Sequence, residues 1–168
     1  HWHGFPEASP IFDGVPDADL EAEGLQVTLR AAIMHLNFQI TGGDGGGGPA
    51  RINLPAGTYK LKVKGGGEDG AVTGDLDIAG PMEIVGAGSA TTTIDGGGAK
   101  DRVFEVLPFG TLDLTGVTIT KGKAVEGKDD TGRGGGMRAT GDVTLTDVVF
   151  TKCSASQDGG GLSVEEGA

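Results

Sequence analysis

Seven aspartates in the repetitive part of the chain are the side chains best suited to acid–base or metal chemistry. Enzymes that cleave polysaccharides need carboxylates that converge in one groove, or acids that hold calcium beside a basic residue. In this sequence the acids are instead spread along predicted strands and corners, mostly at outward positions. They are Asp75, Asp77, Asp95, Asp101, Asp113, Asp142 and Asp147. The pattern therefore predicts no catalytic residue, and a glycan-active enzyme is the less favoured interpretation.

Two metal sites near the N-terminus are also less favoured. Asp13, Asp17 and Asp19 lie in one turn-rich segment and could hold Ca²⁺ together with backbone oxygens. His1 and His3 would form a square-planar copper or nickel site with the terminal amine and two amides, provided that residue 1 is the native N-terminus. Solvated loop charge and a trimmed chain are the simpler explanations, so we predict no metal and no cofactor.

Other candidate features have structural explanations. Lys60, Lys62 and Lys64 alternate with apolar residues, which is typical of charge that protects a sheet edge. The glycine runs lack the Lys-Ser/Thr of a phosphate loop and are interpreted as corners. Cys153 has no second cysteine to pair with inside the chain, and burial as a small residue is favoured over a role in an intermolecular bond.

The elements that must position these residues fall into three segments. Residues 1–24 are acidic and proline-containing, and predict an extended chain. Residues 25–48 hold a capping helix, predicted at about 28–38 with Thr28 as its N-cap, and then a glycine-rich linker. Residues 49–168 change to a period of two, which predicts short strands with one face turned inward.

A repeat within the third segment identifies the fold class. Residues 110–124 align without a gap to residues 141–155, an offset of 31, whereas the Gly-Gly-Gly units at 134–136 and 159–161 are offset by 25. Repeats of this length predict stacked units, and units made only of short strands predict a parallel β-helix. A unit of about 25 residues predicts about five coils, with Leu114 stacked over Leu145 and Ile119 over Phe150.

Composition excludes several classes of protein. The chain of 168 residues contains 34 glycines and 7 prolines, a density that rules out a helix bundle. A net charge of −11 disfavours nucleic acid as a partner, because phosphate binding needs clustered Lys and Arg. No apolar run approaches 18 residues, so we expect no membrane-spanning segment.

The chain resembles the CSLREA-type proteins, which are secreted bacterial right-handed parallel β-helix proteins. The resemblance rests on residues 13–17, 27–33, 54–59, 74–78, 84–88, 94–98 and 101–104 and on both Gly-Gly-Gly units. Pro16 and Val27 stand where the family usually has cysteines, and Ala31 stands where it has glutamate, so a disulfide-stapled entry loop is not expected. The resemblance implies export and a role outside the cell or at its surface, but it brings no agreed catalytic residues.

We therefore expect an exported, non-catalytic structural protein. The last coil has no evident cap, so copies of the chain are expected to stack on it head to tail, or to be joined by the N-terminal segment, into an extracellular fibre or matrix. The alternatives are a carbohydrate-binding or glycan-processing module, with polysaccharide as the partner, and a fragment of a large surface adhesin.

Overall fold

The computed structural model describes residues 28–41, 50–67, 69–127 and 132–166. The predicted extended segment 1–24 lies outside the described residues, and so does the glycine-rich linker at 42–49. The described elements are α1 (Leu29–Thr41), β1 (Ala50–Leu54), β2 (Gly57–Lys60), β3 (Leu76–Ile78), β4 (Pro81–Gly86), β5 (Thr92–Asp95), β6 (Phe104–Val106), β7 (Thr111–Thr120), β8 (Lys123–Ala124), β9 (Met137–Ala139), β10 (Asp142–Thr151), β11 (Ser154–Ala155) and β12 (Leu162–Val164).

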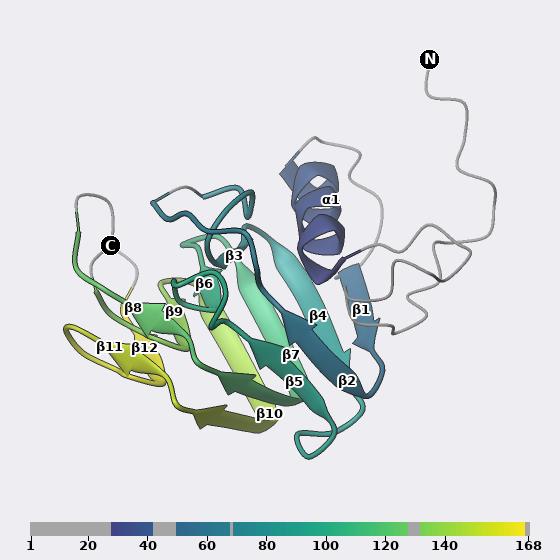
Figure 1. Ribbon diagram of the computed structural model, residues 1–168. Coiled ribbons are helices and arrows are strands. Elements are labelled where there is room, and N and C mark those ends of the chain that lie inside the picture. The colour runs from purple at the N-terminus through teal and green to yellow at the C-terminus, as the bar shows by residue number, and fades with distance from the viewer. Residues whose placement is uncertain (1–27, 42–49, 68, 128–131, 167–168) are drawn as a thin grey trace.

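The strands form a parallel β-solenoid, as the sequence predicts (Figure 1). The first row is β1-β4-β7-β10, and the second is β2-β5 continued by the carboxyl halves of β7 and β10. The third row is β3-β6-β9-β12, and β8 pairs with β11 beside it. Every strand pair is parallel because the chain returns to each row in the same direction after a full coil.

The solenoid has about three turns, so the prediction of about five coils is wrong. The register pairs Ala50 with Met82, Met82 with Leu112 and Leu112 with Val143, which are steps of 32, 30 and 31 residues. Steps of 25 residues occur from Ile94 to Ile119 in the second row and from Met137 to Leu162 in the third. Dividing the chain by its shortest coil overestimated the number of coils.

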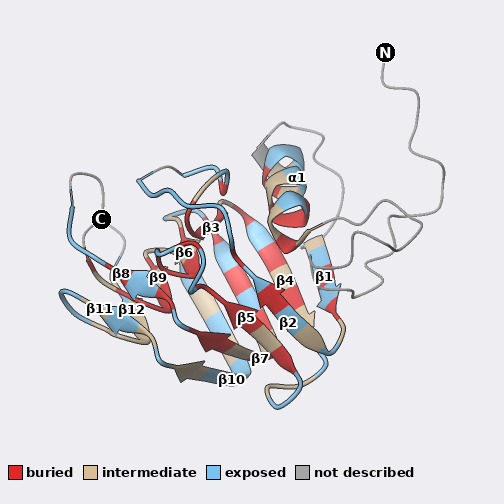
Figure 2. Ribbon diagram, viewed as in Figure 1, coloured by how far each residue is buried: buried red, intermediate tan, exposed pale blue. Residues whose placement is uncertain are grey.

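The inward side chains stack as the repeat predicts. Leu145 lies over Leu114, and Phe150 lies over Ile119. Inward residues of the inner coils are buried, as the alternating red bands in Figure 2 show. Val63 is an exception to the predicted alternation, because β2 ends at Lys60 and Val63 is exposed in the excursion that follows.

The helix α1 covers the start of the solenoid. Its N-cap is confirmed, because the Thr28 hydroxyl accepts a hydrogen bond of 3.0 Å from the amide of Ala31. Leu29, Ala32 and Ile33 are buried in the hydrophobic core together with residues of the first coil. None of the helical segments in the described ranges is long and apolar enough to cross a bilayer.

The long strands β7 and β10 each bend at one residue with positive φ. Gly116 has φ 68°, and the residue stacked above it, Asp147, has φ 51°. The bend interrupts the alternation of inward and outward side chains. The inward residues therefore have even numbers before Gly116 (Leu112 and Leu114) and odd numbers after it (Val117 and Ile119). The bend thus lets one strand contribute to two rows of the solenoid.

Candidate functional site

The outer face of the third row carries a ladder of charged side chains. The register places Asp77 beside Glu105, Glu105 beside Arg138, and Arg138 beside Ser163. Adjacent strands in a sheet lie about 4.8 Å apart, so these outward side chains from successive coils are direct neighbours. Two acids therefore meet without a base between them.

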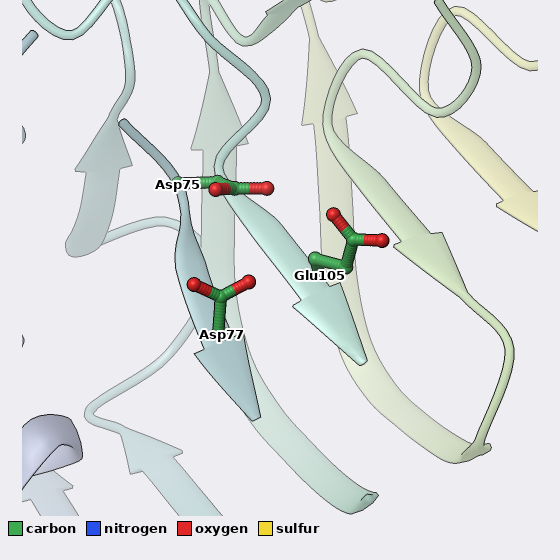
Figure 3. A group of neighbouring side chains, drawn as sticks. All are labelled: Asp75, Asp77 and Glu105. Carbon is green, nitrogen blue, oxygen red and sulfur yellow. The ribbon is translucent and has the colours of Figure 1, made fainter. Parts of the chain in front are cut away.

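Asp75, Asp77 and Glu105 form the carboxylate cluster of this face (Figure 3). One oxygen from each residue lies within 4.8 Å of the others. Asp75 is only 3% exposed and Asp77 is 0% exposed, although neither points into the apolar core. Asp77 accepts a 2.7 Å hydrogen bond from the amide of Ala71, which belongs to the excursion between β2 and β3. That excursion covers the cluster from outside.

Two buried or half-buried arginines pair with these acids and connect the coils. The Nε of Arg102 lies 3.2 Å from Asp75 Oδ2 and 3.8 Å from Glu105 Oε2. Arg138 reaches the other way, at 2.6 Å from Glu105 and 2.8 Å from Glu165. The ion pairs thus run along the solenoid axis from the first coil to the last. The hydrogen bond from Arg138 lowers the pKa of Glu165, as expected for a stabilised carboxylate.

The pKa of Asp75 is shifted in the opposite direction, because the surroundings of Asp75 favour the neutral acid. Burial raises the pKa of Asp75 to about 9, and the neighbouring carboxylates Asp77, Asp101 and Glu105 add to the effect. The positive charge of Arg102 opposes the shift without cancelling it. The surroundings of Asp75 therefore disfavour its charged form, although Arg102 lies beside it.

Oxygen donors at these separations suit a divalent cation as well as a proton. Two neighbouring carboxyl groups are also the arrangement that glycosidases use. A glycosidase, however, must bring its carboxyl groups into contact with a sugar, and Asp75 and Asp77 are covered by protein in this structure. The cluster therefore links coils, and its two aspartates are not open to a substrate.

The aspartates singled out in the sequence divide into two groups. Asp75, Asp77, Asp95 and Asp101 are buried, although Asp77 lies on the outer face of β3 as expected. Asp113, Asp142 and Asp147 are exposed. The metal candidates Asp13, Asp17, Asp19, His1 and His3 lie outside the described residues. The sequence reasoning missed Glu105, Arg102 and Arg138, which could be found only by aligning strands one coil apart.

Asp95 and Cys153 illustrate how the corners are held. Burial alone would raise the pKa of Asp95, but hydrogen bonds from Lys121 and the Gly97 amide lower it overall. The Lys121 ammonium lies 2.8 Å from the Asp95 carboxylate. Cys153 is half-buried rather than buried, and burial raises the pKa of its thiol.

A second candidate site is the terminal coil, formed by β10, β11 and β12. Its inward residues Val143, Leu145, Val148, Phe150 and Leu162 pack on the core but remain partly exposed. Their counterparts one coil earlier, including Leu114 and Ile119, are fully buried. Figure 2 shows the change from buried to half-buried between β7 and β10. This end of the solenoid presents an apolar cross-section bordered by strand edges.

Comparison with protein-family models, with curated proteins and with solved structures finds no match in any of the three. The β-solenoid is consistent with the resemblance to CSLREA-type proteins at the level of fold, and the comparisons give it no further support.

Proposed function

We propose that the chain is an exported, non-catalytic structural module that associates with copies of itself through its solenoid ends and its N-terminal segment. Its place would be outside the cell or at the cell surface, as part of a fibre or matrix. The resemblance to secreted CSLREA-type proteins supports this location, and so does the acidic, solvated surface implied by a net charge of −11.

The observation that carries the proposal is the terminal coil. β10 is a ten-residue strand whose one edge pairs with β7. Its other edge is unpaired among the described strands. Natural proteins cover such edges, because unpaired peptide groups beside apolar side chains favour association with another chain. Val149 and Val164, at 45% and 62% exposed, add apolar surface beside the edge.

The glycan-processing alternative finds less support. The carboxyl groups that come together on the third row are covered by the excursion between β2 and β3. Among the described residues, the exposed Asp113 and Asp142, which lie two register positions apart on adjacent strands, do not belong to a group of three close acids. A non-catalytic role accounts for both facts without requiring an opening of the fold.

The proposal is tested by sedimentation velocity on residues 1–168 over a hundredfold range of protein concentration, with electron microscopy of the largest species. We expect the weight-average mass to rise with concentration. Leu145→Asp should lower it, because a charge at the apolar end opposes burial. Val72→Asp, at an exposed site in the first-coil excursion, is the control and should associate like the parent. A monomer at every concentration would contradict the proposal.

A further inference from the structure

The described lysines lie along one edge of the solenoid. The chain has eight lysines, and seven of them end or follow the strands of the second row. Successive strands of that row end at Lys60, Asp95, Thr120 and Thr151. Six exposed lysines at this edge form what we call the lysine strip: Lys60, Lys62, Lys100, Lys121, Lys123 and Lys152. The seventh, Lys64, lies in the excursion between β2 and β3.

The lysine strip places like charges side by side. Thr120 pairs with Thr151, so the residues that follow them, Lys121 and Lys152, lie on adjacent coils about 4.8 Å apart. Like charges at neighbouring positions of adjacent strands are destabilising. The Lys121 ammonium is 2.8 Å from the Asp95 carboxylate, and among the described residues it is the only ammonium of the strip in an ion pair. Most of the strip's positive charge is therefore not neutralised within the described part of the chain.

Three lysines of the strip also have an unfavourable backbone conformation. The φ angles are 61° at Lys100, 57° at Lys121 and 53° at Lys152. Of the other described non-glycine residues, only Ala71 and Asp147 have a positive φ. Glycine adopts this left-handed conformation without strain, so the sequence keeps three long cationic side chains at a cost in stability. Strain of this kind is typical of surfaces that bind another molecule.

The opposite side of the solenoid carries the complementary charge. Each coil passes through the first row, bends into the second, turns at the lysines and returns through the third. The lysine strip therefore lies across the coil from the first row. Four acids on the outer side of the first row form what we call the acidic face: Glu83, Asp113, Asp142 and Asp147. The only base on this side of the described first-row strands is Arg51, which lies 3.1 Å from Glu83.

The two surfaces match coil by coil. Three successive coils each carry an acid of the face and a lysine of the strip: Glu83 with Lys100, Asp113 with Lys123, and Asp142 with Lys152. A second copy that is displaced sideways, with its axis parallel and level, sets each of these lysines against an acid of its neighbour. On the first coil Lys60 would meet Arg51, so the charges are best matched on the later coils.

We propose that the lysine strip of one copy binds the acidic face of the next copy. This inference rests on the proposed function, since it names a further surface of self-association and the charges that form it. The strip and the face are different surfaces, so the contact does not close on itself. Each added copy presents a free strip or a free face to the next, and parallel solenoids would join side by side into an open row.

Salt dependence separates this contact from an apolar one. Each copy carries a net charge of −11, so screening should strengthen any contact that lacks complementary charges. Sedimentation velocity on residues 1–168 compares about 20 mM with about 500 mM sodium chloride, between which the screening length falls from about 20 Å to about 4 Å. We expect the weight-average mass at a fixed protein concentration to be lower in the high salt.

Neutralising part of the strip gives a sharper test. Lys123→Gln combined with Lys152→Gln should raise the dissociation constant by about tenfold, as expected for the loss of two exposed ion pairs. Lys121 is left in place because it pairs with Asp95. Ala31→Glu combined with Gln39→Glu is the matched control, since it changes the net charge equally at exposed positions of α1, outside both surfaces. The control should associate like the parent.

A charge exchange between two variants identifies the partner surface. Lys123→Glu with Lys152→Glu makes the strip acidic, and Asp113→Lys with Asp142→Lys makes the face basic. Each variant alone should associate more weakly than the parent, because like charges would meet. An equimolar mixture should associate more strongly than either variant, because the acidic strip of one meets the basic face of the other. Both variants remain negatively charged overall, so net charge does not explain such a gain.

The results separate this contact from the proposed function. Association that weakens with salt and with the lysine substitutions, and recovers in the mixture, supports the contact. Association that resists both would overturn the contact and leave self-association through another surface standing. Weakening without recovery in the mixture would also overturn it, and would point to another anionic partner for the lysines, such as the acidic residues 1–24 of a neighbour. A monomer under every condition would overturn the proposed function as well.

Discussion

At the scale of single residues, Asp75 makes stability depend on pH in an unusual direction. Its pKa is raised from 3.8 in the unfolded chain to about 9 in the fold, chiefly by burial. The folded state therefore binds one more proton than the unfolded state between these values, and the free energy of unfolding falls as the pH rises through them. The contribution is fully present below about pH 4 and lost above about pH 9.

The variant Asp75→Asn tests this account, because asparagine imitates the neutral acid and does not titrate. Urea unfolding at pH 5 and pH 8 should show a smaller loss of stability at pH 8 in the variant than in the parent. Asp113→Asn, at an exposed position of β7, is the matched control and should keep the parent's pH dependence. An unchanged slope in Asp75→Asn would show that the titrating proton is held elsewhere.

Asp147 combines two local effects that substitutions can separate. Its φ is 51°, a conformation that favours glycine or asparagine, and its carboxylate accepts hydrogen bonds of 2.6 and 3.0 Å from the Ser89 hydroxyl and amide. These bonds explain why the pKa of Asp147 is lowered. Asp147→Gly loses the bonds but relieves the backbone, whereas Asp147→Ala loses the bonds and keeps the unfavourable φ.

The urea midpoints should therefore decrease in the order parent, Asp147→Gly, Asp147→Ala. Asp142→Ala, at the exposed start of the same strand, serves as a control and should resemble the parent. If Asp147→Ala were as stable as Asp147→Gly, backbone strain at the bend would be negligible.

For single residues, the sequence predicts correctly which face of a strand a side chain lies on, but it does not predict whether that face is buried. Alternation correctly places Asp77 on the outer face of β3, opposite to Leu76 and Ile78. It cannot show that a distant excursion folds back over that face, because Ala71 reaches Asp77 through a loop without periodicity. Alternation within one strand likewise cannot show that Glu105 contacts Arg138 on the next coil.

At the scale of elements, α1 is held to the solenoid by polar as well as apolar contacts. Asn37 is buried and satisfies the carbonyl of Asp77 and the amide of Ala79. Asn37→Ala would leave both backbone groups without these bonds, which costs about 2 to 4 kcal/mol in total. Urea unfolding measures the loss, and hydrogen exchange should show faster exchange at the Ala79 amide. Gln39→Ala, on the exposed face of the helix, is the control and should change stability little.

The coils differ in how strongly they resist an introduced charge. Leu114 is fully buried, so Leu114→Asp should lower the free energy of unfolding by about 4 kcal/mol or more. Leu145 occupies the same register position in the terminal coil but is partly exposed, so Leu145→Asp should cost only about 1 to 2 kcal/mol in the monomer. Urea unfolding at low protein concentration makes the comparison, and equal losses would mean that the terminal coil is covered even in the monomer.

Element-level prediction was good where a local signal existed. Thr28 marked the helix start, and the ungapped repeat fixed the register of β10 on β7. The helix extends to Thr41, beyond the predicted end at 38, and the number of turns was overestimated. The error in the number of turns arises where loops of unequal length connect the strands, because loop length does not follow from the inward pattern.

At the scale of the whole molecule, a fibre needs contacts between copies that do not close on themselves. The N-terminal segment is a candidate for such a contact, because residues 1–24 carry Trp2, Phe5, Ile11 and Phe12, which could anchor an added strand on a neighbour. Deleting residues 1–24 should therefore shorten or abolish long assemblies, as measured by sedimentation velocity and electron microscopy. Replacing the four apolar residues by serine in the full chain is the matched control for chain length and should have the same effect. Long assemblies from residues 25–168 would instead assign their growth to the solenoid itself, and Leu145→Asp in that shortened chain would then show whether the terminal coil is the surface involved.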